Sequence, residues 1–291
     1  MNRERIAPVA SVAGSISVQT GAALGATLFP LIGPLGVVAV RQAVAAAALL
    51  AIARPRWSGL TRRQLVPAAL LGVVLVVMNL SLYSAVERIG LGLAVTLEFL
   101  GPLAVALASS RRKVDGVLAL VAGLGVVLLT GSVPGIDLAG VLFGLVAAVA
   151  WAAYILLNQR VGARLPGVQG TALASAVAAL LTAPVLIGAL ARVPGEQLLM
   201  IVAIGAVVGV LSSAVPYSID LMVLRVLRRE TFAILQSVHP AAGAVAGLIV
   251  LGQVLTSAQL LGIALISGSN IVAIVLGRRS IAPAARLAAG A

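Results

Sequence analysis

The sequence predicts an all-α polytopic membrane protein with ten transmembrane helices arranged as two inverted five-helix repeats. Composition is the first reason: 61% of the 291 residues are hydrophobic and 10% are charged, and the mean hydropathy is +1.17. A soluble domain of ordinary composition carries about 25% charged residues. The spacing of apolar segments and the placement of arginine are the other two reasons. Together they exclude a water-soluble enzyme.

Ten apolar segments have the length that a membrane-spanning helix needs, roughly 20 residues. The first is too long to be the apolar part of a cleavable signal peptide, and it runs into the second through residues 30–34. Alanine, leucine, valine and glycine dominate, without the close alternation of polar residues that membrane strands show. The expected spans are residues 8–29, 36–53, 65–86, 90–109, 114–132, 138–157, 169–191, 197–219, 231–251 and 257–276.

Arginine and lysine fall almost entirely on one side of this topology. With the N-terminus inside, 17 of the 20 basic residues lie in cytoplasmic segments, whereas only Arg88 and Arg192 lie outside. Basic residues are retained on the cytoplasmic side of a membrane, and a missed span would mix the two groups. We therefore expect a multi-pass protein of the bacterial cytoplasmic (inner) membrane with both termini in the cytoplasm.

The charge distribution also indicates an internal inverted repeat. The loops of the first five spans carry 0, 4, 1 and 3 basic residues, whereas those of the second five carry 2, 1, 3 and 0. Two homologous halves of five spans enter the membrane in opposite senses, which reverses such a pattern. Pro102 and Pro240, separated by 138 positions, are a residue-level trace of the repeat. We expect repeats over 1–135 and 136–280, followed by a cytoplasmic tail over 281–291.

Several kinds of site are excluded by what the sequence lacks. It has no cysteine and one histidine, so we expect neither disulfides nor a thiolate or multi-histidine metal site. No HExxH or GxSxG motif and no phosphate-binding loop occurs, so we expect no enzyme, no ATP hydrolysis and no cofactor. The net charge of +12 is distributed between apolar spans. This predicts contact with anionic lipid headgroups rather than nucleic acid.

Glu98 is the only acid deep in a span, the fourth, and Arg41, near the outer end of the second, is the only arginine within a span. A bare carboxylate is costly in lipid, so Glu98 must be protonated, paired or exposed to water. That suits a group that carries a proton or binds an ammonium; the alternative is a structural carboxyl bonded to a neighbouring helix. Arg41 can clamp a substrate carboxylate, pair with Glu98, or extend to the outer headgroups.

Asp220 and His239 are further candidates for substrate or proton binding. Asp220 follows Tyr217 near the cytoplasmic end of the eighth span, where the alternative is an interfacial ion pair with Arg225 or Arg229. His239 lies about two turns inside the expected ninth span. Its imidazole can relay protons, and the alternative is a hydrogen bond to a backbone carbonyl.

Uncharged polar residues form stripes on three of the expected helices. Residues three or four positions apart share a helix face, which must point to protein or to a water-filled cavity rather than to lipid. Close helix packing is the alternative for the serines and for the glycine pairs at 21/25 and 243/247. We expect Gln19, Asn79 and Tyr83 to face a cavity. The stripes are Ser11, Ser15 and Gln19; Asn79 and Tyr83; and Trp151 and Tyr154.

Four stretches carry a pattern that extends over nearly all of residues 11–276. They are SVQTGAALGATLFPLIGPLGVVAVR (17–41), LEFLGPLAVALASSRR (97–112), AWAAYILLNQR (150–160) and PYSIDLMVL (216–224). The pattern resembles the threonine/homoserine exporter branch of the EamA-type drug/metabolite transporter superfamily. The resemblance implies ten helices, inverted repeats, and export of small amino acids from the bacterial cytoplasm coupled to proton entry.

The chain departs from that family at two positions. His239 stands where the family usually has a glutamate directly before the proline of the ninth span, and Gln253 replaces the glutamate that usually ends it. Glu98 is then the natural carboxyl for the exchanged proton. It also complements Arg41, because a transported amino acid brings both an ammonium and a carboxylate.

These observations predict a secondary active exporter of small neutral amino acids that works by proton antiport with alternating access. An exporter of hydrophobic cations or other small metabolites is the alternative, although aromatic residues make up only 3% of the chain. A non-transport membrane protein is less compatible, because the chain has neither a catalytic motif nor a soluble domain. The expected partners are the substrate, protons and membrane lipids, and the oligomeric state stays open.

Overall fold

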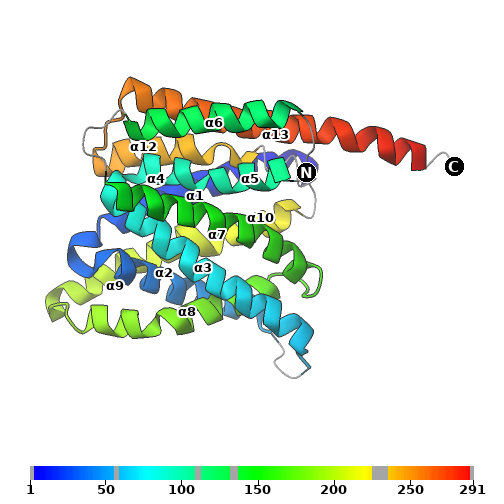
Figure 1. The fold of residues 1–291 in the computed structure, drawn as a ribbon. Helices are drawn as coiled ribbons and strands as arrows, with labels where there is room; N and C mark the ends of the chain where they lie inside the picture. Colours follow the sequence, from blue (N-terminus) through cyan, green and yellow to red (C-terminus); the bar gives the residue numbers. More distant parts are fainter. Residues whose placement is uncertain (1–2, 56–58, 109–112, 132–136, 225–234, 289–291) are drawn as a thin grey trace.

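Helices that run side by side build the fold, with no strand among the residues that the structure describes (Figure 1). The computed structural model describes residues 3–55, 59–108, 113–131, 137–224 and 235–288. Its elements are the helices α1 (Arg3–Ala26), α2 (Phe29–Ala53), α3 (Arg62–Ile89), α4 (Leu91–Glu98), α5 (Leu100–Ala108), α6 (Lys113–Gly131), α7 (Leu138–Gly162), α8 (Gln169–Leu190), α9 (Gly195–Gly209), the π-helical turn η1 (Val210–Ala214), α10 (Val215–Leu224), α12 (His239–Leu251) and α13 (Ser257–Ala288).

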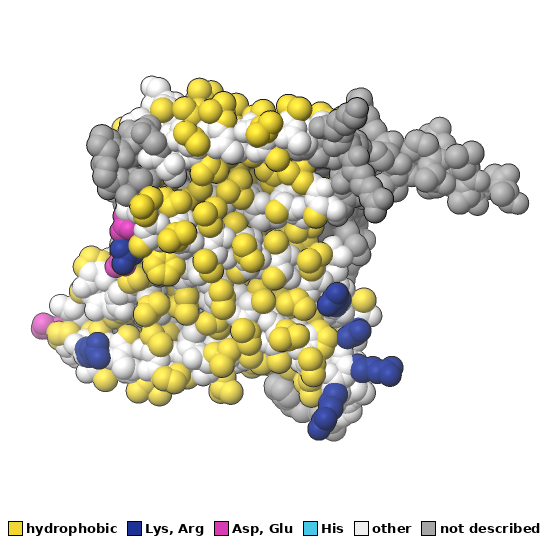
Figure 2. Space-filling view, in the orientation of Figure 1, with side chains coloured by type: hydrophobic (Ala, Val, Ile, Leu, Met, Phe, Trp, Pro, Cys, Tyr) yellow, Lys and Arg dark blue, Asp and Glu magenta, His cyan; other side chains and the backbone are white. Residues whose placement is uncertain are grey.

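The lengths and surfaces of these helices suit a bilayer. Within the described ranges, seven helices are long and apolar enough to cross a membrane. Three shorter apolar helices, Leu91–Val105, Gly116–Thr130 and His239–Leu251, lie at the fourth, fifth and ninth predicted spans. Hydrophobic side chains cover the flank in Figure 2, and charged side chains lie at the two ends. The prediction of an all-helical polytopic membrane protein is confirmed.

The fourth predicted span is two helices rather than one. α4 ends at Glu98, Phe99 forms a turn, and α5 begins at Leu100. Pro102 has no N–H to donate to the Glu98 carbonyl four residues earlier, so a regular helix cannot continue through this point. Glu98 therefore lies at a helix end in the interior, not in the middle of a regular helix.

The eighth span is also irregular. A π-helical turn, η1, separates α9 from α10. Pro216 follows it and lacks the N–H that would bond the Ser212 carbonyl. A wider turn lets the chain pass the proline, and it leaves this carbonyl free for another donor.

The ninth predicted span is also not one continuous helix. α12 begins at His239, with Pro240 in its first turn, after a turn formed by Ser237 and Val238. Proline is well tolerated where a helix starts, because the N–H that it lacks would have no partner there. The prediction that His239 lies two turns inside a helix is therefore wrong. The part of the predicted span before residue 235 lies outside the described residues.

Close glycine contacts set how the helices cross. A Cβ added at Gly125 of α6 would lie 2.9 Å from the carbonyl oxygen of Gly262 in α13, and one added at Gly262 would lie 2.7 Å from that of Gly125. The two backbones thus meet at paired glycines, as small residues allow. The pairs at 21/25 and 243/247 also face other helices closely, so their predicted packing role is confirmed.

Two further glycine contacts resemble one another. A Cβ at Gly72 of α3 would meet the Ala174 carbonyl oxygen and the Val177 side chain of α8. A Cβ at Gly209 of α9 would meet the carbonyl oxygen of residue 41 and the side chain of residue 44 in α2. Gly209 lies 137 positions after Gly72. The residues that the two glycines meet differ by 133 positions, since 174 corresponds to 41 and 177 to 44. The same kind of contact therefore occurs twice, once between α3 and α8 and once between α9 and α2.

Candidate functional site

Arg41 is buried inside the bundle and hydrogen-bonded to the π-helical turn. Its exposed fraction is 4%. Its Nε donates to Ser213 Oγ at 2.8 Å, and Nη2 donates to the Ser212 carbonyl oxygen at 2.7 Å. The second acceptor is the carbonyl that Pro216 leaves without a helical donor. The alternative in which Arg41 extends to the outer headgroups is wrong, because this turn supplies acceptors in the interior.

Tyr83 lies against the same guanidinium. Nη1 of Arg41 is 3.5 Å from the Tyr83 hydroxyl, and Arg41 Cζ lies 5.6 Å from the centroid of the tyrosine ring. Phe29 also packs on Tyr83, with ring centroids 5.9 Å apart. A guanidinium has five N–H groups, and these contacts engage three of them. Arg41 is thus held in place with donor capacity left for an anion.

Glu98 is buried, with an exposed fraction of 5%, at the interruption between α4 and α5. Its carboxyl makes no hydrogen bond and no ion pair with any residue in the described ranges. Arg41 interacts with it electrostatically, but the one ion pair in the described ranges joins Arg88 to Asp137. Direct pairing of Glu98 with Arg41 is therefore not observed. A carboxyl and a guanidinium are thus both buried without a direct contact between them.

A row of three rings continues from Glu98 toward α12. The neighbouring Phe99 packs on Trp151, with centroids 5.7 Å apart, and Trp151 packs on His239 at 5.5 Å. Nδ1 of His239 is 3.1 Å from Nε2 of Gln19. The alternative of a backbone-bonded histidine is thus replaced by a contact with a side chain. Gln19 Oε1 is buried without a hydrogen-bond partner in the described part of the chain, so one acceptor next to His239 is unused.

Tyr154 and Tyr217 lie near one another, because both pack against the apolar core between α3, α7 and α8. Asp220 follows Tyr217 on α10. The Tyr217 hydroxyl is buried with no hydrogen-bond partner among the described residues, and the Tyr154 hydroxyl accepts from Asn158 at 3.2 Å. The predicted partners of Asp220, at positions 225 and 229, lie outside the described residues. No three His, Cys, Asp or Glu side chains in the described ranges gather as metal ligands.

The remaining polar stripes face protein. Ser11, Ser15, Gln19 and Asn79 each have an exposed fraction of 2% or less. Ser15 donates to Gln236 Oε1 at 2.9 Å, which joins α1 to the turn before α12. Asn79 donates to the Leu75 carbonyl of its own helix at 2.7 Å. The structure thus brings Tyr83 to Arg41, but it gives Asn79 a local hydrogen bond and no observed contact with the charged pair.

Four polar residues of this interior were missed by sequence analysis: Ser212, Ser213, Gln236 and Gln42. The first two bind Arg41, and Gln236 binds Ser15. Gln42 is fully buried, and both amide atoms lack a partner among the described residues. A proline four residues after Ser212 and another four after Gln236 were available signals, because each proline frees the carbonyl four positions earlier.

One end of the bundle carries an exposed ion pair. Arg88 Nη1 lies 2.6 Å from Asp137 Oδ2, and Asp137 Oδ1 accepts the N–H groups of Ala139 and Gly140 at the start of α7. The hydrogen bond from Arg88, and then those from the backbone, hold the pKa of Asp137 below its ordinary value. This is an ordinary N-cap reinforced by a cation.

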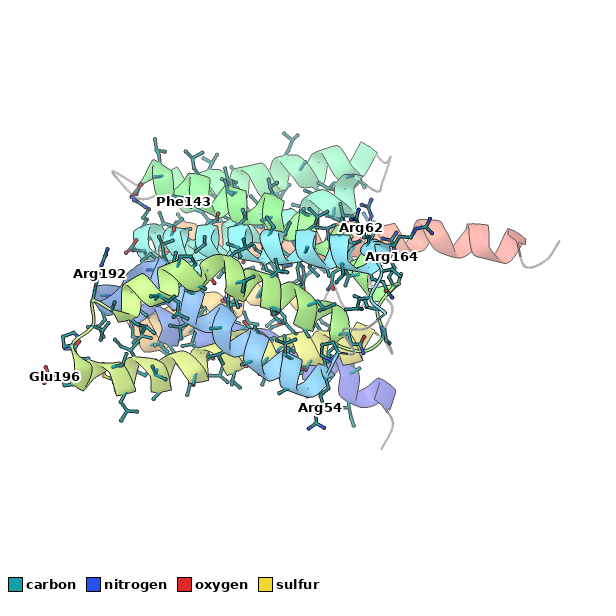
Figure 3. The ribbon with its side chains drawn as sticks, turned by 90° about the horizontal axis from the view of Figure 1, so that it is seen from below. Arg54, Arg62, Phe143, Arg164, Arg192 and Glu196 are labelled. Carbon is teal, nitrogen blue, oxygen red and sulfur yellow. The ribbon has the colours of Figure 1, made fainter. Side chains whose placement is uncertain are left out.

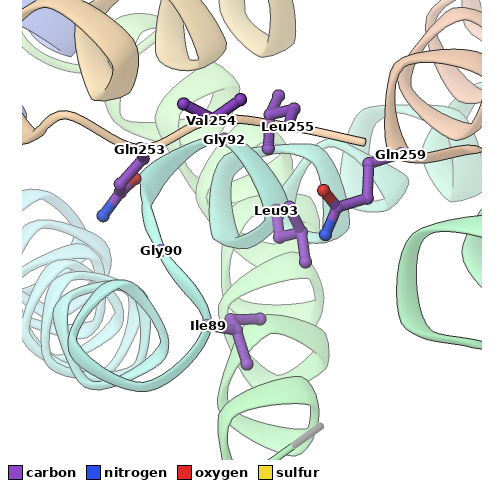
Figure 4. A pocket seen from close by; sticks show the side chains of 8 residues that line it. All are labelled: Ile89, Gly90, Gly92, Leu93, Gln253, Val254, Leu255 and Gln259. Atoms are coloured by element: carbon purple, nitrogen blue, oxygen red, sulfur yellow. The ribbon is translucent and has the colours of Figure 1, made fainter. Parts of the chain in front are cut away.

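A cavity of ≈ 300 Å³ lies beside the turn between α3 and α4 (Figure 4). Gln253, one of its lining residues, accepts the N–H of Leu91 at 2.9 Å. It also faces Gly90, which has a φ of +83° that favours glycine. An amide oxygen therefore caps α4 here, and capping does not require a carboxylate. No residue lining this cavity belongs to the group around Arg41 and Glu98.

Comparison with known proteins places these features in a family. Residues 138–275 match the EamA-like transporter family. The threonine/homoserine exporter RhtA of Escherichia coli (strain K12) is 42% identical, over 87% of this chain and 86% of its own length. The exporter of the same name from Salmonella typhimurium (strain LT2) is 39% identical, over 90% and 89%.

A solved structure described as "Crystal structure of protein" is similar in fold. Its TM-score is 0.60 at 21% sequence identity, over 94% of this chain and 98% of that chain. The two proteins therefore share the arrangement of their helices over both halves of this chain.

Proposed function

The chain belongs to the EamA-like transporter family, in its threonine/homoserine exporter branch, and on this premise we propose that it exports small neutral amino acids such as threonine and homoserine from the bacterial cytoplasm. It is a membrane transporter and not an enzyme. The observation that carries the choice of substrate is the pair of buried, mutually unpaired charges at Arg41 and Glu98.

A zwitterion is the ligand that this pair fits. An amino acid presents a carboxylate and an ammonium, and both lose hydration when they enter a low-dielectric interior. The unused N–H groups of Arg41 can bind the carboxylate, and the carboxyl of Glu98 can bind the ammonium. A substrate with one charge satisfies only one of the two groups and leaves the other unpaired, which is costly.

The residues next to Glu98 support a small substrate. Phe99, Trp151 and His239 form a continuous wall next to Glu98. The unpartnered oxygens of Gln19 and Tyr217 are polar groups available for a hydroxyl such as that of threonine or homoserine. Sites that bind a hydroxyl in this way discriminate against analogues that lack it.

Substrate export is coupled to proton entry because the substrate ammonium and the proton compete for the carboxyl of Glu98. When Glu98 is protonated it cannot hold an ammonium as an ion pair, and when it binds substrate it is deprotonated. A single carboxyl that alternates between proton and substrate gives antiport without a second acid. We assign the exchanged proton to Glu98 and not to the two positions where the family usually has a glutamate. At those positions Gln253 caps α4 and His239 contacts Gln19.

Ten spans in two inverted repeats, over 1–135 and 136–280, complete the proposal. The duplicated glycine contact and the reciprocal contact of Gly125 with Gly262 support this symmetry. Both fourth spans of the repeats are interrupted, next to prolines 138 positions apart. Interrupted helices at the interface of inverted repeats form the midplane site of many secondary transporters. Alternating access then exposes Glu98 to each side in turn.

We infer that the protein lies in the bacterial cytoplasmic membrane with both termini inside. Arg54, Arg62 and Arg164 lie together at one end in Figure 3, opposite Arg192 and Glu196. The arginine-rich end is then cytoplasmic. Its basic side chains contact anionic lipid headgroups.

Cysteine labelling tests this topology, because the chain has no native cysteine. Single cysteines at Ser58, Ser110 and Leu227 should react only with reagent supplied from the cytoplasm. Cysteines at Ile136 and Gly195 should react from outside. Reaction of a cysteine at Ser110 from outside contradicts the ten-span arrangement.

Transport in liposomes tests the substrate. The purified protein is reconstituted, and uptake of a panel of amino acids is measured with and without an imposed pH gradient. We expect threonine and homoserine to move, and the gradient to accelerate them. If no neutral amino acid moves, the proposal is wrong. Movement of hydrophobic cations instead supports the alternative that the carboxyl of Glu98 and the rings of Phe99 and Trp151 would favour.

A further inference from the structure

Asn270 of α13 donates a hydrogen bond to the carbonyl oxygen of Phe99 at 3.1 Å. Both residues are fully buried. Phe99 is the turn residue between α4 and α5, and it directly follows Glu98. A helix from the other half of the chain is therefore bonded to the backbone at the interruption that carries the unpaired carboxyl.

This bond is the observed polar contact of the Asn270 side chain. Its Oδ1 is buried and has no hydrogen-bond partner among the described residues. Buried polar groups without partners cost free energy, so an apolar residue would satisfy the packing of α13 better at this position. The Asn270 side chain is thus used as a donor to the backbone at the interruption.

The start of α5 is also packed against α7. A Cβ at Gly101, two residues beyond Phe99, would collide with the Ala148 carbonyl oxygen. α5 therefore lies directly on the α7 backbone at this point. Two helices therefore contact residues 99–101, α7 by close packing and α13 by a hydrogen bond. Glu98 directly precedes these residues.

We propose that Asn270 is a positioning residue for transport: its bond to the Phe99 carbonyl holds the α4–α5 interruption so that the Glu98 carboxyl faces the substrate opposite Arg41. The inference rests on the proposed function, because it assumes that Glu98 binds substrate or proton. Displacing a reacting group by about 1 Å can cost 100-fold in rate. Asn270 itself contacts neither ligand.

The test compares Asn270→Leu with Ser269→Ala in liposomes. Leucine has the same branching at Cγ, with two methyl groups in place of the amide atoms, and no N–H donor. Ser269 is the neighbouring buried residue, and its hydroxyl has no partner in the described ranges, so Ser269→Ala controls for a general disturbance of α13. We expect Asn270→Leu to lower the maximal rate of threonine transport roughly 10-fold and to displace its pH profile. Ser269→Ala should change neither.

A second variant separates the hydrogen bond from packing. Asn270→Gln keeps an amide N–H donor on a side chain one methylene longer, so we expect it to keep the parental pH profile even if its rate is lower. The inference is overturned if Asn270→Leu folds and keeps the parental rate and pH profile, or if Asn270→Gln displaces the profile as much as Asn270→Leu does. Equal losses in Ser269→Ala and Asn270→Leu also overturn it.

Failure of the proposed function has a different signature. If Glu98→Gln leaves the pH profile of threonine transport unchanged, then Glu98 does not couple transport and the proposed function itself is wrong. If Glu98→Gln changes the profile and Asn270→Leu does not, only the role of Asn270 is wrong.

Discussion

The fourth and ninth spans of this protein are both interrupted, at corresponding positions of the two halves and with different contacts. The first runs Glu98-Phe99-Leu100-Gly101-Pro102 and the second runs Gln236-Ser237-Val238-His239-Pro240, so a glutamate in one half corresponds to a glutamine in the other. The carboxyl of the first makes no hydrogen bond in the described part of the chain. The amide of the second accepts a hydrogen bond from Ser15.

This difference indicates a division of labour between the halves. A neutral amide that is already bonded is an inexpensive structural contact between two helices. A carboxyl without partners in the same kind of environment is costly, and proteins retain such groups for function. The inverted repeat thus supplies two similar interruptions, of which one has kept the ionisable group and the other links α1 to α12.

Moving the carboxyl tests this division most severely. In the double variant Glu98→Gln/Gln236→Glu the total charge is unchanged, but the acid stands on the wrong interruption. We expect threonine transport to fall by more than about 100-fold, because an acid–base group that is out of position loses effects of this size. Initial rates in liposomes measure the loss. Recovery of parental rates in the double variant would mean that the two interruptions are interchangeable.

Arg41 should be the next most sensitive position. Arg41→Lys keeps the charge but removes the planar set of donors that binds Ser213 and the Ser212 carbonyl. We expect the KM for threonine to rise roughly 10-fold, which corresponds to about 1.4 kcal/mol. Arg192→Lys is the matched control, because Arg192 is exposed at the end of the bundle. Equal KM values for Arg41→Lys and the parent contradict a carboxylate clamp at Arg41.

The second interruption should tolerate substitution better. Gln236→Ala removes the bond with Ser15, so we expect a loss of stability of about 1 kcal/mol and a rate within about threefold of the parent. Thermal unfolding in detergent and threonine uptake measure the two effects. Ser15→Ala should have a similar effect on stability, because it removes the same bond. A loss of transport as large as that of the double variant would place function on both interruptions.

The smallest effect is expected at Asp137, outside both interruptions. Its pKa is held below the ordinary value by Arg88 and backbone N–H groups. Its ionised form therefore stabilises the fold above the unfolded-state pKa, and this contribution is lost as the pH falls through the lowered value. Asp137→Asn should lower the melting temperature by about 2 °C or less at pH 7, without affecting transport. The difference should vanish in acid, and a difference that grows in acid contradicts the assignment.

Hydropathy and charge were sufficient to predict the helical membrane fold, because a bilayer requires long apolar segments and sorts arginine by side. The interruptions were not predicted, although Pro102, Pro216 and Pro240 mark all three. Proline in a membrane helix can produce a kink, a wide turn or a break, and the choice depends on which neighbouring groups satisfy the freed carbonyls. That information lies in other helices.

The site was predictable only in part, for the same reason. Glu98 and Arg41 are recognisable because charge is rare in a membrane span. Their partners are not recognisable: Ser213 and Arg41 are 172 positions apart, and Asn270 and Phe99 are 171 apart. Serine and asparagine in an apolar segment are compatible with many packings. Their roles follow only once the helices are placed.

The central claim is that Glu98 couples substrate to protons, and a comparison of two fluxes in one preparation tests it most directly. Parent and Glu98→Gln are reconstituted, and threonine uptake driven by a pH gradient is measured beside threonine–threonine exchange without a gradient. Glutamine keeps the size of the side chain and removes its ionisation. We expect gradient-driven uptake to be abolished in Glu98→Gln while the protein expresses and folds as the parent does, and we expect any remaining exchange to be independent of pH. If Glu98→Gln instead shows parental gradient-driven uptake with the same pH profile, Glu98 is structural and His239 becomes the next candidate for the proton.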